Sequence, residues 1–153
     1  ILDRPRHAEM IFAVREAGAR IVLIGDGDVA GVMATAMPET NIDIYMGTGG
    51  APEGVLAAAA LRCIGGNIQG RLLFRNDDER GRAAKVGVED LNRKYAITDL
   101  AEGDVIFAAT GVTDGNMLQG VRRTASMIFT ESVAMRARTG TVRWIRMQHP
   151  IGN

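Results

Sequence analysis

The chain is built around the stretch Gly47-Thr48-Gly49-Gly50-Ala51-Pro52-Glu53-Gly54. This stretch follows the short apolar run 42–46 and precedes the alanine-rich segment 55–64, so the pattern predicts a strand, a glycine turn and a helix. Glycine has no Cβ atom, which lets the backbone of the turn approach a ligand closely. Pro52 suits the first turn of a helix, where its missing N–H is not needed. The remaining free N–H groups and the positive end of the helix dipole favour an anion such as phosphate.

Glu53 changes the kind of anion site that this turn can form. A carboxylate in the first helical turn repels a phosphate unless a cation lies between them, so the stretch predicts a site for phosphate together with a divalent metal ion. The alternative is an ordinary helix start, in which the acidic side chain interacts favourably with the helix dipole. Spacing alone leaves both interpretations open, because short glycine motifs also occur by chance.

Composition and charge exclude several classes of protein. A chain of 153 residues is long enough for one domain with a core and short for two. Lys plus Arg and Asp plus Glu both number 18, so the charge balance gives no reason to expect nucleic acid or an anionic membrane as a partner. No apolar run approaches the roughly 20 residues that span a bilayer. The single cysteine, Cys63, cannot form an internal disulfide, which fits a reducing cytoplasm.

A basic turn follows the first apolar residues of the chain. Ile1 and Leu2 resemble the end of a strand, and Arg4-Pro5-Arg6 comes directly after it, before a helical pattern that runs to Gly18. Two guanidinium groups held beside a rigid proline suit a phosphate or a cluster of sugar hydroxyls. A solvated basic turn is the simpler alternative.

A second polar turn follows the apolar run 21–24, which has the length of a buried strand. Gly25-Asp26-Gly27-Asp28 comes next, and helical spacing resumes over 29–36. Carboxylates at the carboxyl end of a strand can bind a metal ion or accept hydrogen bonds from sugar hydroxyls. Asp28 can also cap the next helix, and the two roles are compatible. If the strands are parallel neighbours, this turn, the basic turn and the glycine turn meet at one edge of the sheet.

The last third of the chain has a different character. An exposed helix over 77–85 and a buried strand over 105–113 are predicted before it. The segments 121–128, 132–137 and 140–145 are then rich in β-forming residues, with a hairpin turn expected at Thr139-Gly140-Thr141. Such a sheet has one wet face or an edge that faces another subunit, so a homo-oligomer is expected. The sequence contains no repeat or linker, and residues 1–153 are therefore predicted to form a single α/β domain.

Five motifs together resemble the C-terminal half of class II fructose-1,6-bisphosphatase, in the family's order and across nearly the whole chain. They are Asp3-Arg4-Pro5-Arg6-His7, Gly25-Asp26-Gly27-Asp28-Val29-Ala30, Gly47-Thr48-Gly49-Gly50-Ala51-Pro52-Glu53-Gly54-Val55, Phe107-Ala108-Ala109-Thr110-Gly111-Val112-Thr113-Asp114-Gly115 and Arg138-Thr139-Gly140-Thr141-Val142-Arg143. The resemblance implies a layered α/β/α sandwich like that of the lithium-sensitive sugar phosphatases, with a largely parallel sheet and a β-rich C-terminal third. It also implies a cytoplasmic, Mn²⁺- or Mg²⁺-dependent enzyme of gluconeogenesis that removes the 1-phosphate of fructose 1,6-bisphosphate, with sedoheptulose 1,7-bisphosphate as a further candidate substrate.

The resemblance also assigns roles to individual residues. Glu53 matches a metal ligand of the family, whereas Thr48 replaces a common isoleucine. The positions that match residues holding the sugar bisphosphate are Arg4, Pro5, Arg6, Asp26, Gly27, Asp28 and Gly50. The family's other metal-binding carboxylates belong to an N-terminal half, so this chain, which begins at Ile1 without a methionine, is expected to be the C-terminal lobe of a longer enzyme and inactive alone. A non-catalytic module that binds sugar phosphates or nucleotides is the alternative, because fold alone does not determine function.

Overall fold

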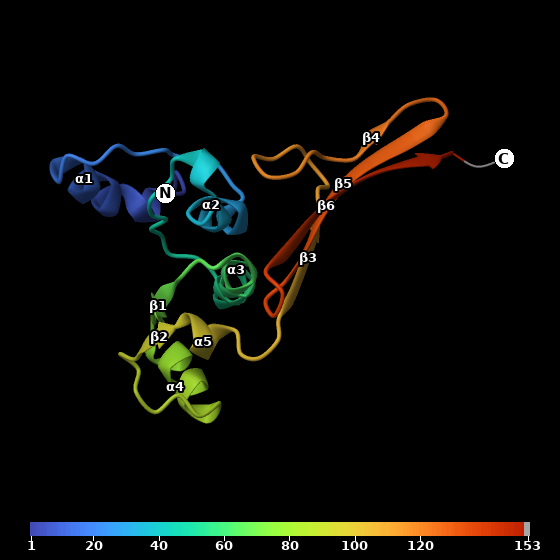
Figure 1. Ribbon diagram of the computed structural model, residues 1–153. Helices are drawn as coiled ribbons and strands as arrows, with labels where there is room; N and C mark the ends of the chain where they lie inside the picture. Colours follow the sequence, from blue (N-terminus) through green and yellow to red (C-terminus); the bar gives the residue numbers. More distant parts are fainter. Residues whose placement is uncertain (152–153) are drawn as a thin grey trace.

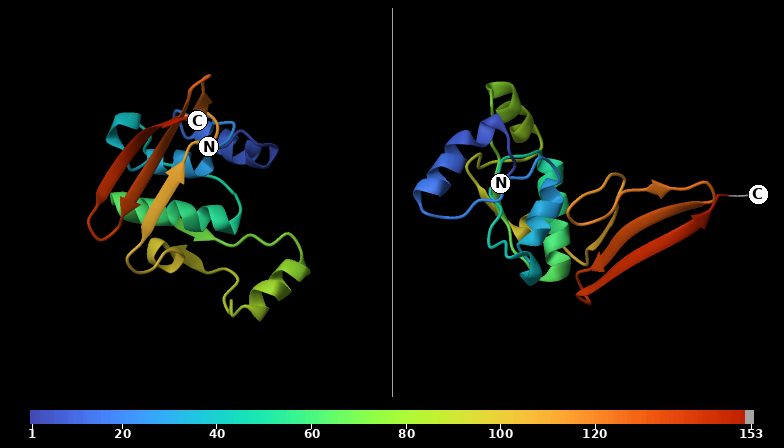
Figure 2. Two further views of the ribbon diagram at one scale, coloured as in Figure 1. Left: turned by 90° about the vertical axis from the view of Figure 1, so that its right-hand side faces the viewer. Right: turned by 90° about the horizontal axis from the view of Figure 1, so that it is seen from above.

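The computed structural model describes residues 1–151 of the chain (Figure 1). Its helices gather into a body, and a long β-hairpin reaches away from that body in the views of Figures 1 and 2. None of the helices in the described part is long and apolar enough to cross a bilayer. In chain order the elements are η1 (Pro5–His7), α1 (Ala8–Glu16), α2 (Asp28–Ala34), η2 (Pro38–Thr40), α3 (Ala51–Ile64), β1 (Gln69–Arg71), α4 (Asp77–Lys85), β2 (Lys94–Ala96), α5 (Ile97–Leu100), β3 (Ile106–Thr110), β4 (Arg122–Arg123), β5 (Met127–Arg136) and β6 (Thr141–Pro150), where η denotes a 3₁₀ helix.

The predicted mixture of helices and strands is confirmed, and so is the β-rich last third. Strand β5 pairs with β3, β4 and β6, and β1 pairs with β2 in a separate small sheet. Along β5 the side chains of Glu131, Val133 and Met135 are buried at every second position, as expected for a strand with one face on a core. The hairpin between β5 and β6 turns at the predicted residues, with Gly140 at a φ of 60°.

The expected parallel sheet is not found among residues 1–151, where both sheets are antiparallel. A single parallel bridge joins Leu2 to Ile24, and residues 42–46 form no strand. The physical reason is that an internal strand needs hydrogen-bonded neighbours on both edges, and the described residues offer none to 42–46. Val22 and Ile44 consequently keep 57% and 67% of their surface exposed, although they lie in runs predicted to be buried.

The core lies between α3 and the sheet that contains β3 and β5. Met33 of α2, Cys63 of α3 and Met135 of β5 belong to one buried cluster, together with Ala60, Phe107, Leu118 and Val133. Ala57, Ala58 and Ala60 are at most 3% exposed, so α3 is nearly covered along one side, where its small side chains allow neighbouring elements to approach closely. Burial raises the pKa of the Cys63 thiol, which fits the role of a small apolar core residue.

Helix α4 confirms the exposed helix predicted over 77–85. The side chain of Asn76 caps it by accepting a hydrogen bond of 2.9 Å from the backbone N–H of Glu79. Arg75 adds a hydrogen-bonded ion pair with Glu79 at 2.6 Å. Local sequence is therefore enough to define this helix, and it has no buried residue.

Glu131 is the one buried acidic side chain of the described core, and it ties the 111–121 loop to the hairpin. Its carboxylate accepts hydrogen bonds from the backbone N–H of Gln119 at 2.7 Å and from Arg146 Nε at 2.6 Å. Both hydrogen bonds hold the pKa of the Glu131 carboxyl below its ordinary value, and the one from Gln119 has the larger effect. As the pH falls, the Glu131 carboxylate is therefore protonated at a higher pH in the unfolded chain than in the folded chain.

This pKa shift predicts a loss of stability in acid. The contribution of Glu131 is present above the ordinary glutamate pKa of about 4.3 and is lost as the pH falls below it. We expect Glu131→Gln to be less stable than wild type at pH 7 and to lose less of its stability between roughly pH 5 and pH 3. Urea unfolding at several pH values measures this, with the exposed Glu89→Gln as control. Equal acid sensitivity of Glu131→Gln and wild type would contradict the assignment.

Candidate functional site

The Gly47–Gly50 loop precedes α3 and lies beside η1 and the start of α2. Arg6 donates a hydrogen bond from Nε to the Thr48 carbonyl oxygen at 2.8 Å. The Thr48 N–H in turn donates to Nε2 of His7 at 2.9 Å. The 3₁₀ helix η1, which overlaps the predicted basic turn, therefore holds the loop through the N–H and the carbonyl oxygen of Thr48, which lies 42 residues from Arg6 and 41 from His7.

Two carboxylates flank the last two glycines of this loop. A Cβ atom added to Gly49 would lie 3.4 Å from Oδ2 of Asp28, and one added to Gly50 would overlap Oε2 of Glu53. The other oxygen of Asp28 accepts a hydrogen bond from the backbone N–H of Val29 at 3.0 Å, at the start of α2. Side-chain atoms at these positions would occupy the space beside both carboxylates. The glycines thus keep the backbone of the loop accessible.

The helix start predicted at the loop is confirmed. Gly50 is the N-cap of α3, Pro52 lies in the first turn, and Glu53 is its acidic residue. No side chain of the described residues caps this end by a hydrogen bond. The first N–H groups of α3 are therefore available to an anion, as the sequence pattern predicts.

The structure brings together some of the predicted site residues and not others. Arg6, Asp28, Gly50 and Glu53 all lie at the loop. Arg4 instead donates to the carbonyl oxygen of its neighbour Asp3 at 3.0 Å and is exposed. Within residues 1–151 neither Arg4 nor Asp26 hydrogen-bonds to the loop.

Pro5 and Gly27 have conformational roles next to the site. Pro5 begins η1, where its fixed φ suits a helical first turn. Gly27 precedes α2 with a φ of 74°, in the left-handed region that favours glycine. They shape the turns that carry Arg6 and Asp28.

Tyr45 was not predicted to be near the site. A Cβ atom added to Gly47 would lie 3.5 Å from the Tyr45 hydroxyl oxygen, so the phenol reaches the loop. Burial raises the pKa of Tyr45, and the negative charge of Asp28 raises it further against the opposing effect of Arg6. The hydroxyl therefore remains a hydrogen-bond donor beside both charged groups. The feature of the sequence that could have indicated this contact is that Tyr45 stands two residues before Gly47.

The described residues do not form a metal centre by themselves. No group of three or more His, Cys, Asp and Glu side chains within residues 1–151 is placed to hold a metal ion. Mg²⁺ and Mn²⁺ need several oxygen ligands, and Glu53 offers one exposed carboxylate. The predicted ion would need ligands beyond those that this part of the chain provides.

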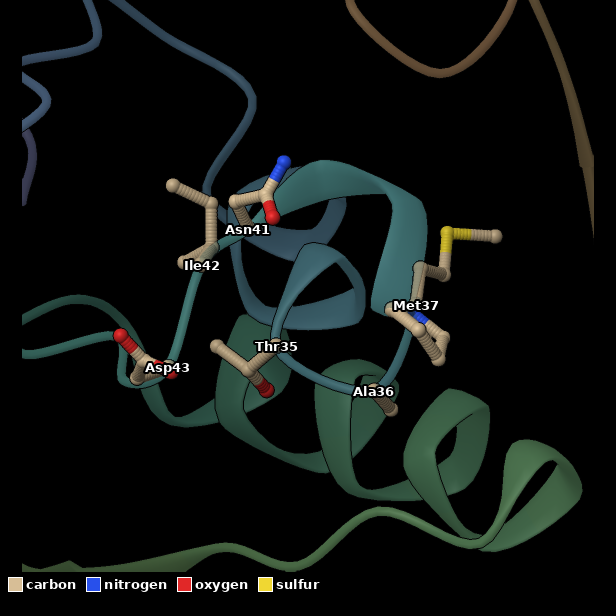
Figure 3. A pocket seen from close by; sticks show the side chains of 7 residues that line it. Thr35, Ala36, Met37, Asn41, Ile42 and Asp43 are labelled. Atoms are coloured by element: carbon tan, nitrogen blue, oxygen red, sulfur yellow. The ribbon is translucent and has the colours of Figure 1, made fainter.

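A hollow of about 380 Å³ shares no lining residue with the loop (Figure 3). It is lined by Thr35, Ala36, Met37, Pro38, Asn41, Ile42 and Asp43, which connect α2 to the extended residues before the loop. None of them is a predicted site residue. Three residues of the loop itself, Gly47, Gly49 and Gly50, are exposed.

Comparison with known proteins supports the resemblance of the motifs. The family model described as bacterial fructose-1,6-bisphosphatase, glpX-encoded, matches residues 1–149. Three curated relatives are each named D-fructose 1,6-bisphosphatase class 2/sedoheptulose 1,7-bisphosphatase. They come from Trichodesmium erythraeum (38% identity, 99% of this chain and 48% of the relative), Crocosphaera subtropica (38%, 97% and 47%) and a Synechococcus species (38%, 97% and 47%).

The chain thus spans about half the length of the curated relatives that it matches. The family match, in contrast, extends over almost every residue of the chain, including the glycine loop and both polar turns. We conclude that this chain belongs to the family of bacterial, glpX-encoded fructose-1,6-bisphosphatases.

Proposed function

We propose that this chain is the C-terminal half of an enzyme that hydrolyses the 1-phosphate of fructose 1,6-bisphosphate, giving fructose 6-phosphate and phosphate in gluconeogenesis. The observation that carries the proposal is the glycine loop, where Arg6, Asp28 and Glu53 meet at the open start of α3. The names of the relatives support sedoheptulose 1,7-bisphosphate as a second substrate. Family membership makes a purely non-catalytic binding module the less favoured alternative.

The chemistry of each group suits a phosphorylated sugar. Arg6 uses Nε for Thr48 within the described residues, and its two terminal nitrogens would donate to a phosphate. Oδ2 of Asp28 and the N–H groups that follow Gly50 would bind hydroxyls and phosphate oxygens respectively. The family resemblance extends this set of substrate-binding residues to Arg4, Pro5, Asp26 and Gly27.

We assign the divalent ion, Mn²⁺ or Mg²⁺, to Glu53 together with carboxylates from the other half of the enzyme. Such an ion neutralises phosphate charge and activates water when several ligands hold it. Because residues 1–151 provide no complete ligand set, the activity requires both halves. We propose that the exposed runs around Val22 and Ile44 then join a parallel sheet in a layered α/β/α sandwich, which would cover their apolar side chains.

The proposed function also leads us to propose a cellular compartment and binding partners. We place it in the cytoplasm, in keeping with the buried free thiol of Cys63, and expect neither nucleic acid nor a membrane as a partner. The ten-residue strand β6 has β5 as its only paired neighbour within residues 1–151. We propose that its open edge, which carries the half-exposed Trp144, takes part in a homo-oligomer.

A phosphatase assay tests whether activity requires both halves of the enzyme. The 153-residue chain with Mn²⁺ and fructose 1,6-bisphosphate is expected to release no phosphate above background, because it lacks a complete set of metal ligands. The whole enzyme is expected to be active, to lose activity with chelator and to lose it in Glu53→Gln. Turnover by the chain alone at the rate of the whole enzyme would overturn the proposal, and so would chelator-resistant activity of the whole enzyme.

The glycine that caps α3 provides a second test. In Gly50→Ala the new methyl group would displace the Glu53 carboxylate. Because that carboxylate is the end of a flexible side chain, the fold should survive. We expect kcat/KM of the whole enzyme to fall by roughly tenfold or more, which corresponds to about 1.4 kcal/mol.

Gly54→Ala is the matched control in the same helix, because nothing lies within 4 Å of the added atom. It should keep its activity and gain up to about 1 kcal/mol of stability from the higher helix propensity of alanine. Thermal unfolding and steady-state kinetics of both variants measure these effects. Equal activity of Gly50→Ala and Gly54→Ala would contradict a site at the loop.

A further inference from the structure

His7 is a fully buried polar side chain to which the proposed function gives no role. It is 0% exposed, although it lies next to the exposed Arg6 at the end of η1. Burying an imidazole without hydrogen bonds is unfavourable, so a ring in this position needs partners for its nitrogens. Both ring nitrogens have one.

The two partners determine which nitrogen carries the proton. Nδ1 lies 2.8 Å from the carbonyl oxygen of Leu2, which can only accept, so Nδ1 is the donor. Nε2 lies 2.9 Å from the backbone nitrogen of Thr48, which can only donate, so Nε2 is the acceptor. Nε2 is also 3.3 Å from the Thr48 carbonyl oxygen, a pair of acceptors that cannot bond to each other in this state. The ring is therefore neutral, with its hydrogen on Nδ1.

This ring connects two segments that are distant in the sequence. Leu2 precedes the basic turn by two residues, and its carbonyl is fixed to the ring, while Thr48 is 41 residues from His7. Arg6 holds the Thr48 carbonyl at 2.8 Å on the other side. With both polar groups of Thr48 bonded, the loop that follows it cannot rotate without breaking these hydrogen bonds, and the one to His7 is partly buried. Gly49 and Gly50, beside the two carboxylates, are the next two residues.

We propose that His7, as the neutral Nδ1–H tautomer, is the positioning residue that holds the Gly47–Gly50 loop in the orientation that binds the phosphorylated sugar. The identity of the ligand rests on the proposed function, whereas the bridge from Leu2 to Thr48 stands on the hydrogen bonds of the structure alone. His7 acts through the loop, so its loss should weaken substrate binding and leave the chemistry of the bound substrate largely intact.

The first arm of the test observes the tautomer directly. Ring ¹⁵N spectra of the histidine-labelled whole enzyme at pH 8, with the His7 signals assigned by difference from His7→Gln, should show a protonated Nδ1 and a hydrogen-bonded, unprotonated Nε2. A ring with its hydrogen on Nε2, or one that averages between both tautomers, would overturn the proposal. This readout does not depend on the reaction that the enzyme catalyses.

The second arm measures the kinetics of His7 variants. His7→Asn keeps a donor near Leu2 but is too short for Thr48, and His7→Phe removes both hydrogen bonds. We expect both to raise KM for fructose 1,6-bisphosphate about tenfold or more, with a smaller change in kcat. His7→Gln places an amide oxygen within reach of the Thr48 N–H and should restore part of the loss. His149→Asn, at the exposed second histidine of the chain, is the matched control and should behave like wild type.

The outcomes separate positioning from a purely structural role. A structural role would lower the yield and unfolding temperature of all three His7 variants while KM of the folded fraction stayed within twofold of wild type, which would overturn the proposal. If His7→Phe does not fold, His7→Asn and His7→Gln still decide through their KM values. If the whole enzyme shows no phosphatase activity, the proposed function and the ligand named here fail, and the tautomer measurement still decides whether His7 bridges Leu2 and Thr48.

Discussion

The described structure depends on the burial of α3 between α2 and the sheet that contains β3 and β5. Along one side of α3 the residues Ala57, Ala58, Ala60 and Leu61 are almost completely covered, and small side chains there let both neighbours approach the helix. The same helix contacts α5, which connects the small sheet to the core. The position of α3 also fixes its first turn, and the first turn carries the glycine loop. The burial of α3 therefore stabilises the core and also fixes the position of the loop.

Charges of both signs surround the backbone of the loop. Arg6 provides a positive charge, Asp28 and Glu53 provide negative charges, and the start of α3 adds the positive end of its dipole. A phosphate alone would be attracted by some of these groups and repelled by others. Under the proposed function, a sugar phosphate accompanied by a divalent ion would interact favourably with all of them.

Features with local causes were predictable from the sequence. The start of α3 was found because Gly50 and Pro52 have conformational preferences that act within one turn, and α4 and the hairpin at Gly140 were found for similar reasons. The strands over 21–24 and 42–46 were not formed, because an apolar run becomes a strand only when neighbouring strands pair with it. His7 and Tyr45 were missed as neighbours of the loop because their contacts depend on tertiary structure rather than on any spacing within a motif.

The central claim is that the loop at the start of α3 is where the enzyme holds its sugar phosphate. A crystal structure of the whole enzyme with Mn²⁺ and fructose 6-phosphate tests it most directly. We expect the sugar phosphate within hydrogen-bonding distance of Arg6, Asp28 and the Gly50 backbone, and the ion bound to Glu53. A sugar phosphate bound elsewhere, for example in the hollow between Thr35 and Asp43, with the loop unchanged and Glu53 without metal, would contradict the account.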